Sequence, residues 1–128
     1  MGQYYKIVNI DKKEYLHPHA FGDGLKLMEF GSSAGGTLTG LAILLADGNG
    51  HGGGDFHEED VKEPIAGRWK GDKIVIAGDY ADPGSFIPDT YKGDHEISLY
   101  EFIDREKWDN ISAMVIQAMK DAGEWERK

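Results

Sequence analysis

The apolar residues of this chain occur in short runs, and each run ends at glycine, proline or charged residues. The run "YYKIVNI" (4–10) is rich in aromatic and β-branched residues, which predicts a strand, and "EYL" (14–16) follows as its hairpin partner. Two later runs repeat their apolar residues at helical spacing. These patterns predict an α+β fold with a mainly antiparallel sheet, a buried helix at about 37–46 and an amphipathic C-terminal helix at about 110–122.

Further runs complete the predicted sheet. The segment "LKLMEF" (25–30) has the alternating leucines of a strand. The segments "IAGRW" (65–69) and "KIVIAGDY" (73–80) flank the turn "KGD", which is typical of a β-hairpin. Because "KIVIAG" is apolar on both faces, we expect it in the middle of the sheet. The segment "ISLYEFI" (97–103) fits either a last strand or the start of a helix.

The composition bounds both the size and the partners of the protein. The chain is long enough for a single domain, residues 1–128, with its own core, and 40% of its residues are apolar. The formal net charge of −9 repels phosphate backbones and anionic lipid heads, so we expect neither general nucleic-acid binding nor membrane binding. Cysteine is absent, and the longest apolar run, 41–46, is far shorter than a membrane span. We expect a cytoplasmic protein whose metal ligands are histidines and carboxylates.

The glycine-rich segment "GSSAGG" (31–36) is the first candidate site. It lies between the predicted strand 25–30 and the predicted helix that starts at Thr37, so backbone N–H groups and the positive end of the helix dipole would face a bound anion. The segment differs from a nucleotide-binding P-loop because Thr37 stands where that motif has lysine. The alternative is a small-residue loop that lets the helix pack closely.

We expect a small, nucleotide-like anion to be held at this segment by Gly31, Ser32, Ser33, Gly35, Gly36 and Thr37. The candidate positive partners are Arg68 and Lys73, and the candidate stacking surfaces are Tyr80 and Tyr91. Both tyrosines belong to a long irregular stretch, 79–96, of a length that often carries function. Its carboxylates Asp79 and Asp82 follow a strand and could act in acid–base chemistry, although ordinary turn formation explains them equally well.

Histidines and acids in two loops form the second candidate, a divalent metal site. The segment "DGNGHGGGDFHE" (47–58) matches most of a calcium-loop pattern, but its histidine stands where the cation needs an oxygen ligand. A zinc, manganese or iron site would instead join two histidine-containing pairs, with an acid as general base. The candidate ligands are His17, His19, Asp47, Asn49, His51, Asp55, His57 and Glu58. The alternative is that these are solvated loop residues.

Three segments form a pattern when they are read in order: the opening "MGQYYKIVN", "LAILLADGNGHGGGD" (41–55) and "GRWKGDKIVIAGDY" (67–80). This pattern resembles that of a family of small proteins found in bacteria and their phages. The resemblance covers most of residues 1–82 and brings no catalytic residue to this chain. It implies a context, because short acidic proteins of this kind often bind a host protein or a small signalling molecule.

The sequence therefore supports three functional hypotheses. The first is a binding protein for a small anionic ligand at the glycine-rich segment. The second is a metal-dependent hydrolase that uses loop histidines and carboxylates. The third is a protein-interaction module whose acidic surface occupies a basic site on a host protein.

Overall fold

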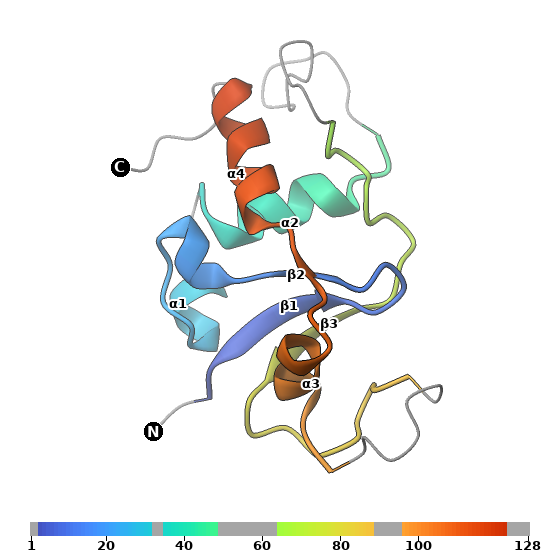
Figure 1. Ribbon diagram of the computed structural model, residues 1–128. Helices are drawn as coiled ribbons and strands as arrows, with labels where there is room; N and C mark the ends of the chain where they lie inside the picture. The colour runs from blue at the N-terminus through green and yellow to red at the C-terminus, as the bar shows by residue number, and fades with distance from the viewer. Residues whose placement is uncertain (1–2, 32–34, 49–63, 89–95, 123–128) are drawn as a thin grey trace.

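A four-stranded sheet forms the centre of the computed structural model, which describes residues 3–31, 35–48, 64–88 and 96–122 (Figure 1). The strands are β1 (Tyr5–Asn9), β2 (Glu14–Leu16), β3 (Ile74–Gly78) and β4 (Asp109–Asn110). They lie in the order β3-β1-β2-β4, and β1 pairs antiparallel with both β2 and β3, whereas β4 pairs parallel with β2. The mainly antiparallel sheet predicted from the sequence is confirmed.

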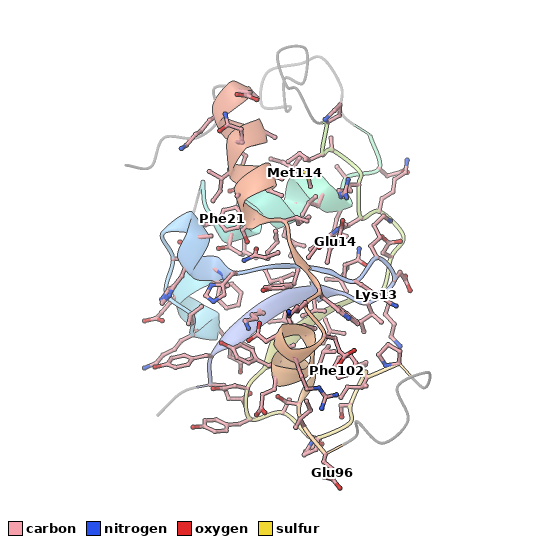
Figure 2. All side chains as sticks on the ribbon, in the orientation of Figure 1. Lys13, Glu14, Phe21, Glu96, Phe102 and Met114 are labelled. Atoms are coloured by element: carbon pink, nitrogen blue, oxygen red, sulfur yellow. The ribbon has the colours of Figure 1, made fainter. Side chains whose placement is uncertain are left out.

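Helices cover both faces of the sheet. They are η1 (Pro18–Phe21), α1 (Leu27–Gly31), α2 (Thr37–Leu45), α3 (Leu99–Arg105) and α4 (Ser112–Asp121). The side chains of β1 alternate between two cores, with Ile7 packed among residues of α2 and α4 and Val8 packed among residues of α3. Figure 2 shows Phe21 and Phe102, which belong to these two cores, on opposite sides of the sheet. The predicted α+β class is confirmed.

Both helices predicted from helical spacing are present as α2 and α4. Close packing explains the glycine inside α2, because a Cβ atom at Gly40 would lie 3.0 Å from Cγ1 of Val115 and 3.1 Å from Cε2 of Phe21. The buried side chains of α2 lie on this side of the helix. The helix is nevertheless less enclosed than predicted, since Ala42 and Leu45 are exposed.

The predicted strand at 25–30 is wrong, because this segment enters the short helix α1. The carboxylate of Glu29 accepts a hydrogen bond from the backbone N–H of Lys26 at 3.0 Å, which satisfies a free donor at the start of the helix. The helix buries Phe30 completely and leaves Met28 exposed. Alternating leucines therefore misled the prediction, since one aromatic anchor and a local cap decide the conformation.

The predicted hairpin of 65–69 with the β3 segment is also wrong. The N–H groups of Gly67 and Trp69 donate instead to the carbonyl oxygens of Ile43 and Leu44, at 2.9 and 2.8 Å, in the last turn of α2. β3 pairs with β1, whose other side is taken by β2. β3 therefore lies at an edge of the sheet. The prediction that it lies in the middle of the sheet is wrong.

The ambiguous segment 97–103 leads into helix α3. The hydroxyl of Ser98 accepts a hydrogen bond from the N–H of Glu101 at 3.4 Å, in the position of an N-cap. Leu99 and Phe102 of this helix are buried against the sheet. Of the two alternatives that the sequence left open, the helical one is confirmed.

Candidate functional site

The outer edge of β3 has no strand partner among the described residues. The N–H of Ile10 donates to the carbonyl oxygen of Lys73 at 3.0 Å, and the N–H of Asp79 donates to that of Tyr4 at 2.9 Å, so Lys73 and Asp79 hydrogen-bond toward β1. Hydrogen bonding alternates along an antiparallel strand, so the β3 residues whose N–H and C=O groups face outward are Ile74, Ile76 and Gly78. We call these backbone groups the outer edge.

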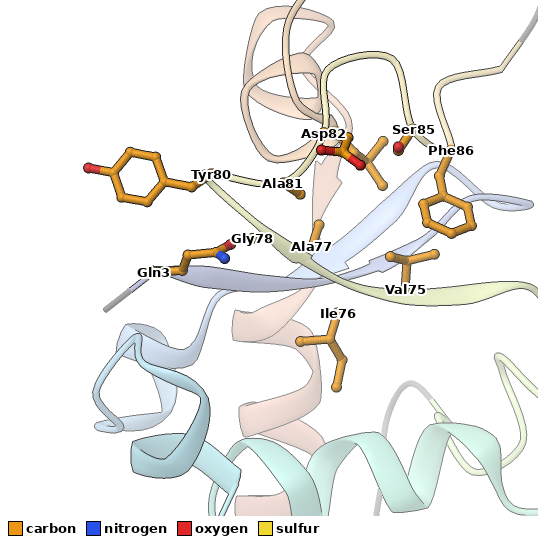
Figure 3. A pocket seen from close by; sticks show the side chains of 11 residues that line it. Gln3, Val75, Ile76, Ala77, Gly78, Tyr80, Ala81, Asp82, Ser85 and Phe86 are labelled. Atoms are coloured by element: carbon orange, nitrogen blue, oxygen red, sulfur yellow. The ribbon is translucent and has the colours of Figure 1, made fainter. Parts of the chain in front are cut away.

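A cavity of about 420 Å³ lies beside the outer edge, and we call it the edge groove. Residues 75–78 of β3 form one wall, and the loop 80–86 contributes the other. Figure 3 shows the side chains of Val75 and Ala77 on the side of this loop and Ile76 on the opposite side of the strand. The groove therefore follows the same strand that carries the outward-facing backbone groups.

Large apolar side chains are exposed around the edge groove. Ile76 is 42% exposed, Phe86 52% and Tyr80 70%. Phe86 has a φ of 62°, in the left-handed region that residues with a Cβ atom rarely adopt, so the loop holds this ring in place against a local backbone cost. Exposed apolar groups beside a groove are typical of surfaces that bind other molecules.

The two ends of the outer edge carry opposite charges. Lys73 precedes β3, is exposed, and its ammonium group lies 5.4 Å from the centroid of the Phe86 ring. Asp79 and the exposed Asp82 follow the strand, and one carboxylate oxygen of Asp79 accepts a hydrogen bond from the N–H of Tyr4 at 3.0 Å. The outer edge is thus bounded by a cation at its start and by carboxylates at its end.

At the predicted anion site, the chain supplies a carboxylate of its own. The backbone N–H and the hydroxyl of Thr37 both donate to Oδ2 of the buried Asp23, at 2.8 and 2.6 Å. The N–H of Gly35 donates to the hydroxyl of Thr39 at 2.9 Å. The expected cap at Thr37 is corrected, since the N-cap residue is Gly36, which has no side chain to cap the helix. Asp23 therefore takes the place at the start of α2 that a bound anion would take.

The other residues predicted for anion binding, where the structure describes them, lie on separate elements. Gly31 ends α1, whereas Ser32, Ser33 and Tyr91 lie outside the described residues. Arg68 forms an ion pair with Glu14, and Lys73 and Tyr80 flank the two ends of β3. The anion-binding hypothesis stays a prediction.

Of the predicted metal ligands, the structure describes His17, His19 and Asp47. The rings of His17 and His19 lie 5.6 Å apart, and Nδ1 of His17 accepts a hydrogen bond from the N–H of His19 at 3.3 Å. Burial, together with nearby Lys6 and His19, lowers the pKa of His17 and favours its neutral form. Asp47 is exposed and lies 3.4 Å from the ammonium of Lys70.

The remaining predicted ligands lie outside the described residues: Asn49, His51, Asp55, His57 and Glu58. Within the ranges that the structure describes, no group of three histidine, aspartate or glutamate side chains is placed to hold a metal ion. The metal hypothesis therefore stays a prediction.

Two polar clusters, each centred on one buried charged side chain, have no signal in the sequence. Lys6 is 3% exposed, and its ammonium lies 2.8 Å from a carboxylate oxygen of Asp104 and 4.1 Å from the ring centroid of Tyr100. Burial raises the pKa of Tyr15 and of Tyr100, and the charge of Asp104 raises both further. This first cluster joins β1 to α3 across 98 positions of the chain, which no local pattern records.

The second cluster centres on Glu14. Its carboxylate accepts hydrogen bonds from Nε and Nη2 of Arg68, at 3.1 and 2.5 Å, and from Nε1 of Trp69 at 2.8 Å. Burial acts to raise the pKa of Glu14, but the hydrogen bonds from Arg68 and Trp69 outweigh it and hold the pKa below its ordinary value. Both carboxylate oxygens of Glu14 are hydrogen-bonded, and the cluster anchors the segment before β3 on β2.

None of the helices in the described ranges is both long enough and apolar enough to cross a bilayer. The family resemblance based on residues 1–82 stays a prediction. Comparison with protein-family models, with curated proteins and with solved structures finds no match to this chain.

Proposed function

We propose that this chain is a protein-interaction module that binds an extended polypeptide segment by strand addition along β3. The observation that supports the proposal is the outer edge, whose backbone groups have no strand partner among the described residues and adjoin the edge groove. In strand addition, main-chain hydrogen bonds supply affinity, and pockets for alternate side chains supply specificity. The exposed side chains of Ile76 and Phe86 would contact the added strand.

The charges at the two ends of the outer edge favour one kind of segment. In an antiparallel arrangement the start of the added segment lies beside Asp79 and Asp82, and its end lies beside Lys73. A segment that begins with a basic residue, continues with apolar residues and ends with an acidic residue matches these charges. Like the third hypothesis from the sequence, this proposal makes the chain a protein-interaction module. The contact is however a single apolar strand, and not an acidic surface that occupies a basic site.

A synthetic peptide tests the proposal directly. The peptide begins with lysine, ends with glutamate and alternates valine and threonine between them, and the readout is amide hydrogen exchange of the protein by NMR. We expect slower exchange at the amides of Ile74 and Ile76, because both become hydrogen-bonded to the peptide. The matched control is the same peptide with N-methylated alternate amides, which retains the side chains but cannot pair along the strand.

A proline at the outer edge provides a second control. Since the N–H of Ile76 faces away from β1, the Ile76→Pro variant keeps the ladder with β1 and loses only an outward donor. We expect this variant to fold and to leave the peptide unbound. Equal protection with the methylated peptide, or protection that Ile76→Pro does not remove, would contradict strand addition.

A further inference from the structure

We propose that the segment bound at the outer edge is β3 of a second copy of this chain, paired antiparallel about a twofold axis at Ile76. The inference rests on the proposed function and names its partner. The strand with its flanks, "KIVIAGD" (73–79), is complementary to itself in this register. A twofold pairing uses the same surface of both copies and closes on itself, so it yields a dimer and not a fibre.

The register follows from the residues that face outward. An axis at Ile76 places this residue opposite its own copy and places Ile74 opposite Gly78 of the second copy. Every outward-facing residue of β3 then meets another outward-facing residue, and the Ile76 pair can exchange both backbone hydrogen bonds. In the Ile74–Gly78 pairs the N–H of Gly78 is the open donor, because its carbonyl oxygen already accepts a hydrogen bond from the N–H of Ala81 at 3.2 Å. A register displaced by two residues leaves Ile74 or Gly78 of each copy without a matching residue in the strand.

The same register pairs the charges. Lys73 and Asp79 lie at equal distances from Ile76 along the chain, so Lys73 lies opposite Asp79 of the second copy, and the symmetry repeats this pair. Both residues are separated from Val75 and Ala77 by even numbers of positions, so all four side chains are on the same face of the sheet. Opposite charges that face each other across two strands stabilise the pairing. The displaced registers place Lys73 opposite Ala77 or Ala81 instead.

Exposed apolar surface adds to this interface. Ile76 is 42% exposed and meets its own copy at the axis, and the half-exposed ring of Phe86 lies in the groove beside Val75. The dimer removes both long edges from solvent and forms one continuous sheet that has β4 at each end. The net charge of −9 on each copy opposes association at long range, but at physiological ionic strength salt screens exposed charges separated by more than about 8 Å.

Sedimentation equilibrium at physiological salt, from micromolar to millimolar protein, measures the dimer directly. We expect a concentration-dependent dimer, accompanied by protection of the Ile74 and Ile76 amides from hydrogen exchange. Reversing one charge, Lys73→Asp, places like charges opposite each other at both ends of the interface, and we expect dimerisation to weaken about tenfold. The matched control, Lys70→Asp, changes the net charge equally but lies outside the pairing, so it should leave dimerisation unchanged.

Restoring the charge pair tests the register. In the Lys73→Asp, Asp79→Lys double variant the opposite charges face each other again, and we expect the dimer to recover. Because Asp79 also accepts a hydrogen bond from the N–H of Tyr4, thermal unfolding of each variant verifies that it is folded. The Asp79→Asn variant retains that acceptor and removes only the charge, so it should weaken the dimer less than Lys73→Asp does.

The outcomes separate this inference from the proposed function. A chain that stays monomeric at millimolar concentration, or a dimer that is insensitive to Lys73→Asp, overturns the second-copy inference. If the monomer still shows the peptide-induced protection of Ile76, the proposed function stands without it. If neither the peptide nor a second copy protects Ile76, both proposals fail.

Discussion

The two edges of the sheet differ in length, polarity and protection. β4 consists of the exposed polar residues Asp109 and Asn110, and the chain then enters α4. β3 is longer and apolar, and Ile76 at its centre is 42% exposed. Proteins usually protect sheet edges by short strands, charged residues or a covering segment. β4 is short and contains a charged residue, whereas β3 is longer and has no charged residue within the strand. This difference indicates that the edge at β3 is the one available for pairing.

The two sides of the sheet also differ in how their neighbours are anchored. Beside β4, the buried carboxylate of Glu14 holds Arg68 and Trp69 through hydrogen bonds of 2.5 to 3.1 Å. Beside β3, the loop 80–86 is held by backbone bonds such as that from Gly84 to Ile97, and it leaves a groove. Variants should therefore change folding stability on the β4 side and association on the β3 side.

The Glu14→Gln variant should have the largest effect on stability. The neutral side chain loses the ion pair with the partly exposed Arg68 and weakens the hydrogen bonds to the carboxylate, so we expect the free energy of unfolding to fall by about 1.5–3 kcal/mol. Urea unfolding monitored by tryptophan fluorescence measures it. The matched control is Glu96→Gln, an exposed site, which should change stability by less than about 0.5 kcal/mol. Equal losses in the two variants would contradict the anchoring role of Glu14.

Lowering the pH should remove the stabilisation that the charged carboxylate of Glu14 provides. The pKa of Glu14 is lower in the folded protein than in the unfolded chain, so its stabilisation is fully present above the unfolded pKa, about 4.3, and is lost as the pH falls through the folded value. The difference in unfolding free energy between the native chain and Glu14→Gln should therefore narrow below about pH 4. A difference that stays constant down to pH 3 would show that the charge of Glu14 is not responsible.

The Asn110→Ala variant should have a moderate effect and should act on the fold alone. The side-chain oxygen of Asn110 accepts a hydrogen bond from the N–H of Ser112 at 3.0 Å, so we expect a loss of about 1 kcal/mol in unfolding free energy. Asn110→Asp retains the acceptor and should recover most of this loss. Dimerisation and the exchange rate of the Ile76 amide should not change in either variant. A change in association here would contradict the separation of the two edges.

The Ile76→Lys variant should have the smallest effect on stability and a large effect on association. Because Ile76 is partly exposed and its outward backbone groups serve no strand in the described residues, we expect a change of about 0.5 kcal/mol in unfolding free energy. Two lysines would face each other at the twofold axis, so sedimentation should detect a monomer. A large loss of stability with the dimer retained would place Ile76 in the core and exclude it from the pairing surface.

Local sequence patterns correctly predicted the helices and strands whose conformation depends mainly on their own residues. Helix α4 follows from its apolar stripe, and the strand at 4–10 follows from its β-branched and aromatic residues. The segment 25–30 misled the prediction because its leucines alternate, whereas Phe30 alone is buried and Glu29 caps the helix.

The candidate site was only partly predictable. Lys73, Tyr80, Asp79 and Asp82 were singled out for binding or acid–base roles, and the structure places them around the outer edge. Their common role could not be recognised, because "KIVIAG" was expected in the middle of the sheet. Apolar residues on both faces of β3 reflect the two cores that cover these faces, and they do not specify which strands pair beside it.

The sequence by itself determined where strand β1 and helices α2 and α4 form, because periodicity and composition act over a few neighbouring positions. Only the tertiary structure decided that β3 pairs with β1, that Asp23 occupies the start of α2, and that Glu14 holds Arg68 and Trp69. These contacts join residues far apart in the chain. They depend on how whole elements pack together, and within the described ranges that packing leaves the outer edge of β3 without a strand partner.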